Sequence, residues 1–390
     1  GALSRRAEAE LADFLENWHA RGASAWYEHW MGKLATLRSE VGAFAGTRGE
    51  QVALMPSTSV ALAVAAESVS YGERNKVVIA DLDFPTLAYQ WAVKPEVEVV
   101  VVRSEDGVGI DPEQFREAVD ERTAFLATSH VFYATGHRQD LSALADVAHE
   151  AGALCLIDGY HGVGQVATDL DASGVDFYTT GPLKWLLGGP GLSYLWASPD
   201  MIQRAEPRIT SWFAHRDQFA FDLENFQYHD DARRFEMGTP ALPTVHTSLG
   251  GQAILSEIGA TRVEERNRAL ADHLHQALEG AGFALTRSAD PEHRTAIVMV
   301  QHDDPAGAVA FLATRGITVD YRPGHVRVSP HFYNTVEELD RFVDVLASYR
   351  PELQTVAAQG FGTAFCSEAL PPPRETCPTL LSPAARSSTS

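Results

Sequence analysis

The sequence predicts an α/β protein, with a mostly parallel sheet in a large lobe and a smaller α+β lobe after it. Between residues 76 and 180, short and almost wholly apolar strands alternate with helical segments of about ten residues, which is typical of a parallel sheet covered on both faces. Asp158 and Lys184 each follow a predicted strand, and a parallel crossover would bring both to one edge of the sheet. The 390 residues are enough to bury a large core.

The N-terminal segment is expected to be helical. Apolar residues recur at helical spacing from Ser4 to about Phe44, and Gly22 interrupts them, which predicts two helices. A short strand ending at Met55 and a helix from about Val60 follow. The start of the helix at about Val60 is the first position in the chain that could bind a phosphate.

The large lobe is expected to alternate strands and helices. Strands are predicted at residues 76–80, 97–102, 123–130, 153–158 and 175–180, and helices at 84–93, 112–121 and 141–151. Residues 193–198 form an apolar run after a glycine-rich turn, which indicates an antiparallel strand that returns to the sheet. A long irregular stretch rich in aromatic residues is expected from Trp212 to Pro243.

The C-terminal part predicts a smaller lobe and a tail. A helix is expected from about Thr244 through to Glu279, followed by strands near 296–300 and 326–329 and a last helix over 336–348. Beyond about Thr355 the chain is rich in proline and serine, which is typical of disorder. The predicted domains are an N-terminal helical segment that joins the small lobe (1–45), the large lobe (46–245), the small lobe (246–355) and a disordered tail (356–390).

Composition favours work on small molecules. The 31 basic and 52 acidic residues give a net charge of −21, which argues against a nucleic-acid-binding or anionic-membrane surface. Cys155, Cys366 and Cys377 form neither a disulfide framework nor a zinc cluster, and no metal site is predicted. No apolar run reaches the roughly 18 residues of a membrane span, and no signal peptide is recognised, so a cytoplasmic protein is expected.

Three residues around the predicted sheet edge could carry chemistry. Lys184 lies in a strand-to-loop turn beside Trp185, where partial desolvation would lower its pKa and make it a nucleophilic amine; alternatively it is a solvated surface lysine. Asp158 ends an apolar run, where a carboxylate needs a cationic partner such as a pyridinium nitrogen; otherwise it is a turn former. His161 could lie against a cofactor ring or be a packed polar residue.

Further candidates lie before and after this edge. Ser57, Thr58 and Ser59 precede a helix, where exposed amides and the helix dipole bind phosphate, although such residues also cap helices generally. Phe84 follows a strand and could stack on an aromatic cofactor or join the core. Arg327 lies in a predicted strand of the small lobe and could bind a carboxylate bidentately or form a surface ion pair. In this order along an α/β chain, these groups are what pyridoxal phosphate chemistry requires.

The sequence phrases around these residues resemble a known family. They are PSTSVALAV, DFPTLAYQ, SHVFYATGHRQDLSALADVAHEAGAL, IDGYHGVG, LKWLLGGPG, SWFAH, RRFEMGTPAL and VRVSPHFYNT. From about residue 10 to 350 the chain resembles the class V branch of the fold-type I pyridoxal phosphate enzymes, and most of all kynureninase and its relatives. The resemblance implies a seven-stranded-type sheet in the large lobe, pyridoxal 5′-phosphate as cofactor, a free amino acid as substrate, and a homodimer with active sites at the subunit interface.

The resemblance also assigns roles to individual residues. Lys184 would hold the cofactor covalently and move protons, Asp158 would hold the proton of the pyridinium nitrogen, and His161 would lie near the phenolic oxygen of the ring. Phe84 would stack on the ring, and Arg327 would bind the substrate α-carboxylate. The phosphate would be bound by the hydroxyl triplet, through the Thr58 amide and the Ser59 hydroxyl, with Trp212 nearby and Thr239 contributed by the second subunit.

Several positions depart from the kynureninase pattern. Leu183 stands where kynureninases usually have a tyrosine whose hydroxyl binds the phosphate, and Thr179 or Thr180 could compensate. Leu87 stands where many relatives have an aspartate, and the asparagine-containing loop that touches substrate would fall before the first residue. The stretch TVDYRPGHVRVS contains no cysteine, which disfavours the persulfide mechanism of the related cysteine desulfurases.

The favoured function is therefore cleavage of an amino acid at Cβ, by hydrolysis of a C–C bond or by β-elimination, including C–S lyase chemistry. An aminotransferase and an amino-acid racemase or epimerase share the early steps and stay open as alternatives. Residues 162–167, GVGQVA, fit the glycine pattern of a nicotinamide-dinucleotide-binding turn, which is a remote alternative. A non-catalytic binding protein on the same fold is a further one.

Overall fold

A seven-stranded mixed sheet forms the centre of the molecule. The structure is a computed structural model and describes residues 1–350. The strands are β1 (Val52–Met55), β2 (Lys76–Ala80), β3 (Glu98–Val102), β4 (Thr123–Ser129), β5 (Leu154–Asp158), β6 (Phe177–Thr180) and β7 (Ser193–Ala197), in the order β1-β7-β6-β5-β4-β2-β3. The run β3-β2-β4-β5-β6 is parallel, and β7 is antiparallel to both β6 and β1. The predicted fold class and the antiparallel return strand are confirmed.

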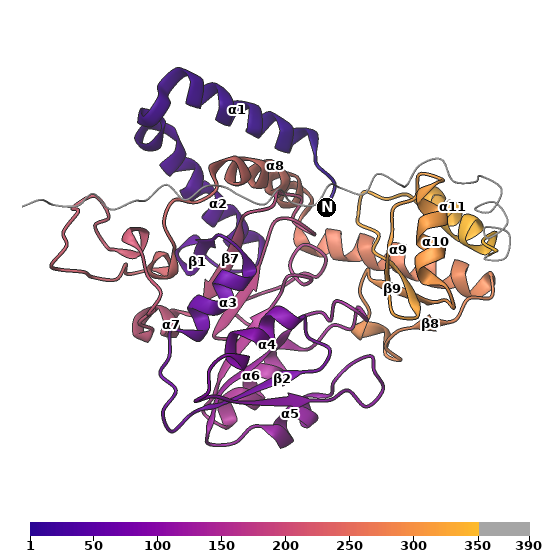
Figure 1. Cartoon of the computed structure of the whole chain (residues 1–390). Coiled ribbons are helices and arrows are strands. Elements are labelled where there is room, and N and C mark those ends of the chain that lie inside the picture. Colours follow the sequence, from indigo (N-terminus) through magenta and orange to yellow (C-terminus); the bar gives the residue numbers. More distant parts are fainter. Residues whose placement is uncertain (351–390) are drawn as a thin grey trace, which may run out of the picture. The chain divides into compact units, whose positions relative to one another are not determined.

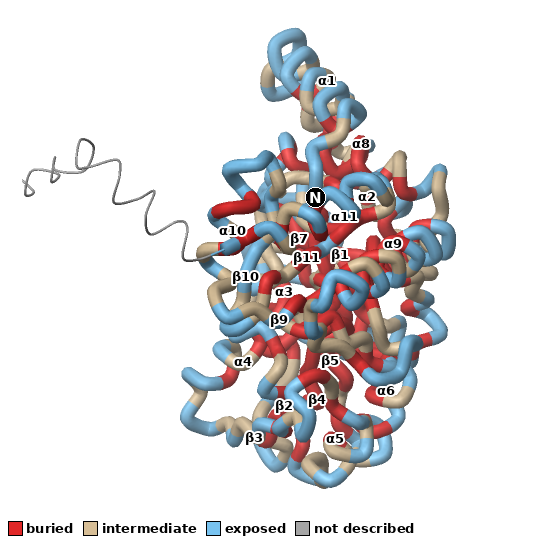
Figure 2. Tube along the Cα trace, turned by 90° about the vertical axis from the view of Figure 1, so that its right-hand side faces the viewer, coloured by how far each residue is buried: buried red, intermediate tan, exposed pale blue. Residues whose placement is uncertain are grey.

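The side chains of alternate strand residues pack into two apolar cores, one on each face of this sheet. Ala53 and Leu156 belong to one core, whereas their neighbours Leu54 and Ile157 belong to the other. The first core is covered by α3 (Thr58–Ala66) and α4 (Pro85–Ala92), and the second by α2 (Met31–Phe44), α5 (Pro112–Ala118), α6 (Leu141–Glu150) and α8 (Leu242–Ile258). Figure 2 shows that the buried residues concentrate along β1, β4, β5 and β7 in the interior.

The N-terminal helices pack over α8, as Figure 1 shows. Helix α1 (Arg5–Arg21) begins at the N-cap Ser4 and ends at Gly22, whose φ of 53° is accessible to glycine without steric cost. A 3₁₀ turn (Gly22–Ser24) and a π-helical turn (Trp26–Trp30) lead into α2. The predicted pair of helices broken near Gly22 is confirmed.

The C-terminal part contains a second, antiparallel sheet in the order β10-β11-β9-β8. Its elements are α9 (Ala260–Gly280), β8 (Leu285–Thr286), β9 (Val298–Gln301), α10 (Pro305–Ala313), β10 (Asp320–Arg322), β11 (His325–Val328) and α11 (Val336–Ala347). The expectation of one helix from Thr244 to Glu279 was wrong, because Gly259 adopts a φ of 88° and separates α8 from α9. Helix α10 and the two- and three-residue strands β8 and β10 were not predicted.

The remaining predictions for the chain have mixed outcomes. Residues 212–241 are irregular apart from the 3₁₀ turns Trp212–Ala214 and Ala232–Phe235, as expected, but α8 begins at Leu242, within the expected irregular stretch. A short helix α7 (Pro199–Arg204) precedes these residues. Residues Gly1–Tyr349 pack as one unit, and the predicted division into lobes stays a prediction. The tail predicted for 356–390, with Cys366 and Cys377, lies outside the described residues.

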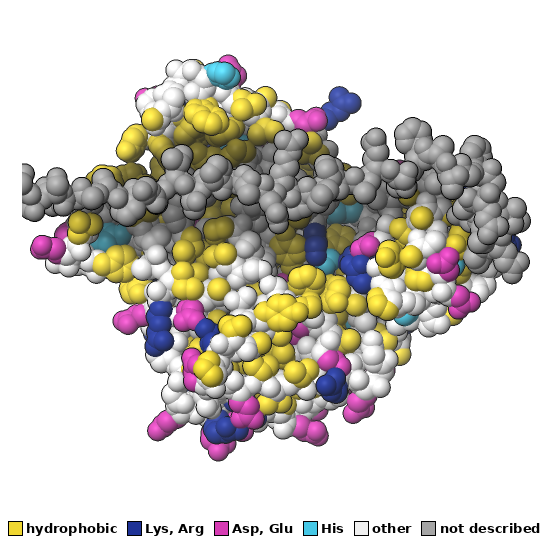
Figure 3. Space-filling view, in the orientation of Figure 1, with side chains coloured by type: hydrophobic (Ala, Val, Ile, Leu, Met, Phe, Trp, Pro, Cys, Tyr) yellow, Lys and Arg dark blue, Asp and Glu magenta, His cyan; other side chains and the backbone are white. Residues whose placement is uncertain are grey.

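The surface carries charges of both signs. On the face drawn in Figure 3, acidic side chains lie among the basic ones. Among the helices of residues 1–350, none combines the length and the apolar character needed to cross a lipid bilayer.

Candidate active site

A cavity of about 330 Å³ lies at the carboxyl ends of β4 and β5 and at the N-termini of α3 and α4. This volume falls within the range of roughly 300–1,000 Å³ typical of small-molecule sites. It is lined by Pro56, Ser57, Thr58, Ser59, Phe84, Thr86, Ser129, Val131, Tyr133, Asp158, Tyr160, His161, Leu183, Lys184, Pro190, Gly191 and Leu192. The parallel pairing of β5 and β6 thus brings Asp158 and Lys184 to one sheet edge, as the sequence predicted.

Lys184 lies next to His161 in this cavity. Its Nζ is 2.6 Å from His161 Nε2 and 4.7 Å from the centroid of the Tyr160 ring. Burial, together with the positive charge of Arg327, lowers the pKa of Lys184 to about 8. This lower pKa makes a part of the amine unprotonated near neutral pH, where an ordinary lysine is almost wholly protonated, and a nucleophile or a base requires that unprotonated form.

Trp185 determines which ring nitrogen of His161 carries the proton. The Trp185 indole nitrogen donates to His161 Nδ1 over 3.1 Å, and an indole N–H can only donate. Nδ1 must accept, so that the proton of the neutral ring is on Nε2 and points to the lone pair of Lys184 Nζ. Burial and the neighbouring Lys184 also lower the pKa of His161, which keeps the ring neutral.

Asp158 supplies a buried negative charge at the end of β5. Its Oδ1 accepts a hydrogen bond of 2.9 Å from the Tyr160 amide. Burial raises the pKa of Asp158, while this amide and Lys184 act in the opposite direction. A buried carboxylate is suited to a cationic partner, and the protonated nitrogen of a pyridine ring is such a partner.

Hydroxyl groups surround the start of α3. Ser57 caps the helix by accepting from the Val60 amide over 3.3 Å. Thr58 Oγ1 lies 3.0 Å from Ser193 Oγ, and Ser59 Oγ lies 2.7 Å from Thr86 Oγ1 on α4. These hydroxyls and the amides of the helix N-terminus form a site suited to a phosphate group.

Phe84 presents its ring to the cavity and is 50% exposed. It meets the Tyr133 ring edge to face, with centroids 5.3 Å apart. The preceding Asp83 is buried and fixes this turn, because its Oδ1 accepts from the Ser129 amide and hydroxyl, both at 2.7 Å. An exposed, positioned aromatic ring is suited to stacking on a planar ligand.

Arg327 lies on the second sheet, and it is not among the residues that line the cavity. It lies on β11, and its positive charge is one cause of the lowered pKa of Lys184 and His161. Burial and the neighbouring Arg322 lower the pKa of Arg327 itself to about 10. Its Nε is buried and has no hydrogen-bond partner within residues 1–350, so this guanidinium can donate a hydrogen bond to an anionic ligand.

Three of the residues expected to bind the cofactor do not line the cavity. The Thr180 hydroxyl is buried on the other side of β6 beside Val41 and Tyr194, where it lacks a partner among the described residues. Trp212 and Thr239 are exposed and lie outside the cavity wall. Thr179 bonds to the Tyr194 carbonyl instead.

The dinucleotide-binding alternative is contradicted by the local fold. Its glycine pattern requires a strand, a tight turn and then a helix. Residues 162–167 follow β5, but the chain passes through turns to β6 with no helix between them.

Sequence reasoning missed several residues of the site. Thr86, Ser129 and Tyr160 line the cavity, and Asp83 and Trp185 orient the residues that do. Thr86 and Asp83 belong to the phrase DFPT that pointed to Phe84, so the signal was present. The contacts of Ser129 and Trp185 depend on tertiary structure.

Comparisons with known proteins agree with this site. Residues 3–342 match the family model described as Aminotransferase class-V. The uncharacterized aminotransferase YcbU of Bacillus subtilis is 28% identical, over 89% of this chain and 91% of its own length. A kynureninase of Geobacillus thermodenitrificans is 26% identical, over 91% of this chain and 87% of its own.

Solved structures share the fold. The cysteine desulfurase of Thermococcus onnurineus superposes with a TM-score of 0.79 at 19% identity, covering 89% of this chain and 92% of its own. The cystine C–S lyase C-DES, in complex with its product cysteine persulfide, gives 0.82 at 16% identity, covering 90% and 95%. The family match, the buried acid opposite a lysine, the hydroxyl-lined helix start and the exposed aromatic ring fit one cofactor. The chain belongs to the class-V aminotransferase family of enzymes, and its cofactor is pyridoxal 5′-phosphate.

Proposed function

We propose that this enzyme cleaves a free amino acid at Cβ, by hydrolysis of a C–C bond or by β-elimination. The observation that carries the proposal is the Lys184 amine, which has a pKa lowered to about 8 and lies 2.6 Å from the His161 ring in a cavity that also contains Asp158. Such an amine can remove the Cα proton, the step with which both reactions begin. The similarity to kynureninases supports the choice of Cβ cleavage.

The residues of the cavity would bind the cofactor as follows. Pyridoxal 5′-phosphate, when bound, supplies an electron sink for the negative charge that develops at Cα. Asp158 would hold the proton on the ring nitrogen, and Phe84 would stack on the ring. Ser57, Thr58 and Ser59 would bind the phosphate, and the Thr86 hydroxyl, next to that of Ser59, would be a further hydrogen-bonding group.

Lys184 and His161 would act on the substrate. Lys184 would accept the Cα proton, and the protonated amine could then return a proton to a carbon atom of the substrate or of the cofactor. The N–H of His161 Nε2, held in place by Trp185, would direct the Lys184 lone pair before the proton is transferred. Arg327 would bind the α-carboxylate through charge-assisted hydrogen bonds.

The apolar part of the cavity lining favours an apolar substrate side chain. Leu183, Val131 and Tyr133 contribute apolar and aromatic surface to the cavity. In C–C hydrolysis of a γ-keto amino acid, water adds to the γ-carbonyl, and the products are alanine and a carboxylic acid. In β-elimination the leaving group departs with a proton, and water converts the remainder to pyruvate and ammonia.

Product analysis tests this proposal. The purified enzyme with cofactor would be incubated with kynurenine, 3-hydroxykynurenine and cysteine conjugates, and alanine, pyruvate and the released fragments would be measured by mass spectrometry. We expect fragmentation of at least one substrate, which Lys184→Ala abolishes and Lys94→Ala leaves unchanged. Lys94 is a matched control because it pairs with Glu67 on the protein surface away from the cavity.

An aminotransferase is the second candidate, because YcbU carries that description at 28% identity. Transfer of the amino group to a keto acid without fragmentation of the donor would establish it and refute Cβ cleavage. Racemisation of the substrate, seen by chiral chromatography, would instead favour the racemase alternative.

We also propose that the enzyme is a homodimer in the cytoplasm, with Trp212 and Thr239 completing the active site across the subunit interface. The exposure of both residues outside the cavity wall supports this arrangement. Light scattering on the purified protein would measure the mass. A monomer that binds the cofactor fully would contradict it.

A further inference from the structure

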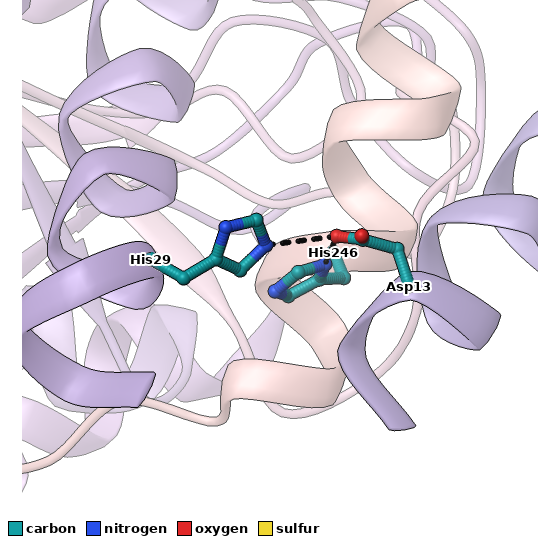
Figure 4. A group of neighbouring side chains, drawn as sticks. All are labelled: Asp13, His29 and His246. Atoms are coloured by element: carbon teal, nitrogen blue, oxygen red, sulfur yellow. Dashed lines mark hydrogen bonds and ion pairs between the residues drawn. The ribbon is translucent and has the colours of Figure 1, made fainter. Parts of the chain in front are cut away.

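Side chains from three helical segments converge away from the active site. Figure 4 shows Asp13 of α1, His29 of the turn Trp26–Trp30 and His246 of α8 pointing toward one another. One nitrogen or oxygen atom of each lies within 4.8 Å of those of the other two. His29 Nε2 is 2.9 Å from Asp13 Oδ2, and His246 Nδ1 is 3.6 Å from the same oxygen. None of the three lines the active-site cavity.

The separations are close to those of a metal coordination sphere. Imidazole nitrogen and carboxylate oxygen bind zinc at about 2.0–2.2 Å, so that neighbouring ligand atoms of a tetrahedral site lie roughly 3.3–3.6 Å apart. Side-chain shifts of about an ångström or less in His29 and Asp13, both half-buried, would place the three ligand atoms at this separation. Glu10 Oε2 lies 3.6 Å from His246 Nδ1 and offers a further carboxylate ligand.

His246 is the buried member of the group. Its side chain is fully buried, and its Nε2 has no hydrogen-bond partner among the described residues. Nδ1 donates to the Glu10 carbonyl over 3.1 Å in the present arrangement. An imidazole must be neutral to bind a metal ion. A shift of the ring proton from Nδ1 to Nε2 frees Nδ1 for the metal without changing the charge.

Lys33 is the cation that a metal would have to replace. Its Nζ lies 2.7 Å from Glu10 Oε2 and 3.3 Å from Asp13 Oδ2. With neutral histidines, the two carboxylates and this one ammonium leave one negative charge, so the group favours added positive charge. The lysine side chain is flexible and partly exposed, and it can move to solvent when a metal ion binds.

We propose that Asp13, His29 and His246, with Glu10 nearby, form a binding site for a divalent transition-metal ion of the zinc type. The mixed nitrogen and oxygen ligands favour Zn²⁺ over Mg²⁺ or Ca²⁺. Because the ligands come from α1, the turn after it and α8, the ion stabilises the packing of the N-terminal helices on α8. The site is structural and separate from the chemistry at Lys184.

Titration of the metal-free full-length enzyme, loaded with its cofactor, tests the proposal. Calorimetry with zinc chloride is expected to show one strong site per chain. His29→Gln and His246→Gln should weaken binding at least about tenfold, the lower end of losses seen even for residues that only support metal ligands. His149→Gln is the matched control, because His149 Nε2 is also 2.9 Å from a carboxylate, that of Asp176, and should leave binding unchanged.

A lysine variant distinguishes a metal site from a simple hydrogen-bonded group. Lys33→Met removes the competing cation and should tighten zinc binding, whereas Lys94→Met should not. Zinc should also raise the melting temperature of the wild type but not that of His29→Gln. The proposal is refuted if wild type and Lys33→Met both fail to bind zinc, or if binding survives His29→Gln and Asp13→Asn unchanged. These two half-exposed positions decide the matter should the buried His246→Gln fail to fold.

Discussion

Lys184 Nζ lies 2.6 Å from Nε2 of His161, and this pair joins the two parts of the chain that the sequence singled out, the end of β5 and the turn after β6. The contact is compatible with one protonation state, in which the imidazole donates from Nε2 and the amine accepts. Burial lowers the pKa of both groups, while Asp158 beside them stays in place for a cationic ring nitrogen.

The first prediction concerns pH. Because the pKa of Lys184 is lowered from 10.5 to about 8, the folded protein has lost this proton between these values while the unfolded chain still holds it. Where the unfolded state binds more protons, stability rises with pH, so the cofactor-free protein should become more stable from about pH 8 to 10.5. Denaturant unfolding as a function of pH measures this. Lys184→Met should remove this contribution, and an identical profile in that variant would contradict the assignment.

The second prediction concerns Trp185. Trp185→Phe keeps an aromatic ring but removes the indole N–H that fixes the His161 tautomer. The loss of one hydrogen bond of about 1 kcal/mol should reduce kcat/KM about fivefold and mix the His161 tautomers. Nitrogen-15 NMR of the imidazole reports the tautomer directly. Trp91→Phe is the control, since that buried indole donates to the Tyr71 hydroxyl away from the site, and a pure Nε2–H tautomer in Trp185→Phe would refute the role.

The third prediction separates the two arginines. Arg327→Lys should raise KM for the amino acid about tenfold or more, because an ammonium group cannot bind a carboxylate bidentately. Arg322 is already paired with Asp320 at 2.6 Å, so Arg322→Lys should change KM much less. Steady-state kinetics at fixed cofactor concentration compares them. Equal effects on KM would show that the α-carboxylate is not bound by Arg327.

The sequence was sufficient to predict the sheet and the main residues of the cavity. Continuous apolar strands and helix-length spacers define a parallel sheet, and the ends of such strands meet at one edge. Asp158 and Lys184 could therefore be placed together without coordinates, and the hydroxyl triplet was added as a group that pyridoxal phosphate chemistry requires. The resemblance to the family added the family membership and the cofactor, which the comparisons confirm.

What the sequence did not predict depends on contacts between distant segments. Asp83 accepts from Ser129, 46 positions along the chain, and local spacing carries no signal for such a bond. The break at Gly259 was missed because helix-forming sequence lies on both sides of it, in α8 and α9. Thr180 was expected at the cofactor as a possible replacement for the tyrosine hydroxyl missing at Leu183, but the alternation of side chains along β6 turns its hydroxyl to the opposite face.

The last prediction concerns Leu183, where this chain departs from the kynureninase pattern. Leu183 lines the cavity and is 41% exposed, so a larger side chain can be accommodated there. Leu183→Tyr should supply a hydroxyl to the cofactor phosphate and tighten cofactor binding about tenfold or more, since a hydrogen bond to a charged group contributes roughly 1.5–3 kcal/mol. Equilibrium titration of the cofactor, followed by protein fluorescence, gives the Kd. Leu183→Phe has nearly the same shape without the hydroxyl, so equal tightening in both variants would attribute the gain to packing. No tightening in Leu183→Tyr would show that the phosphate lies out of reach of this position.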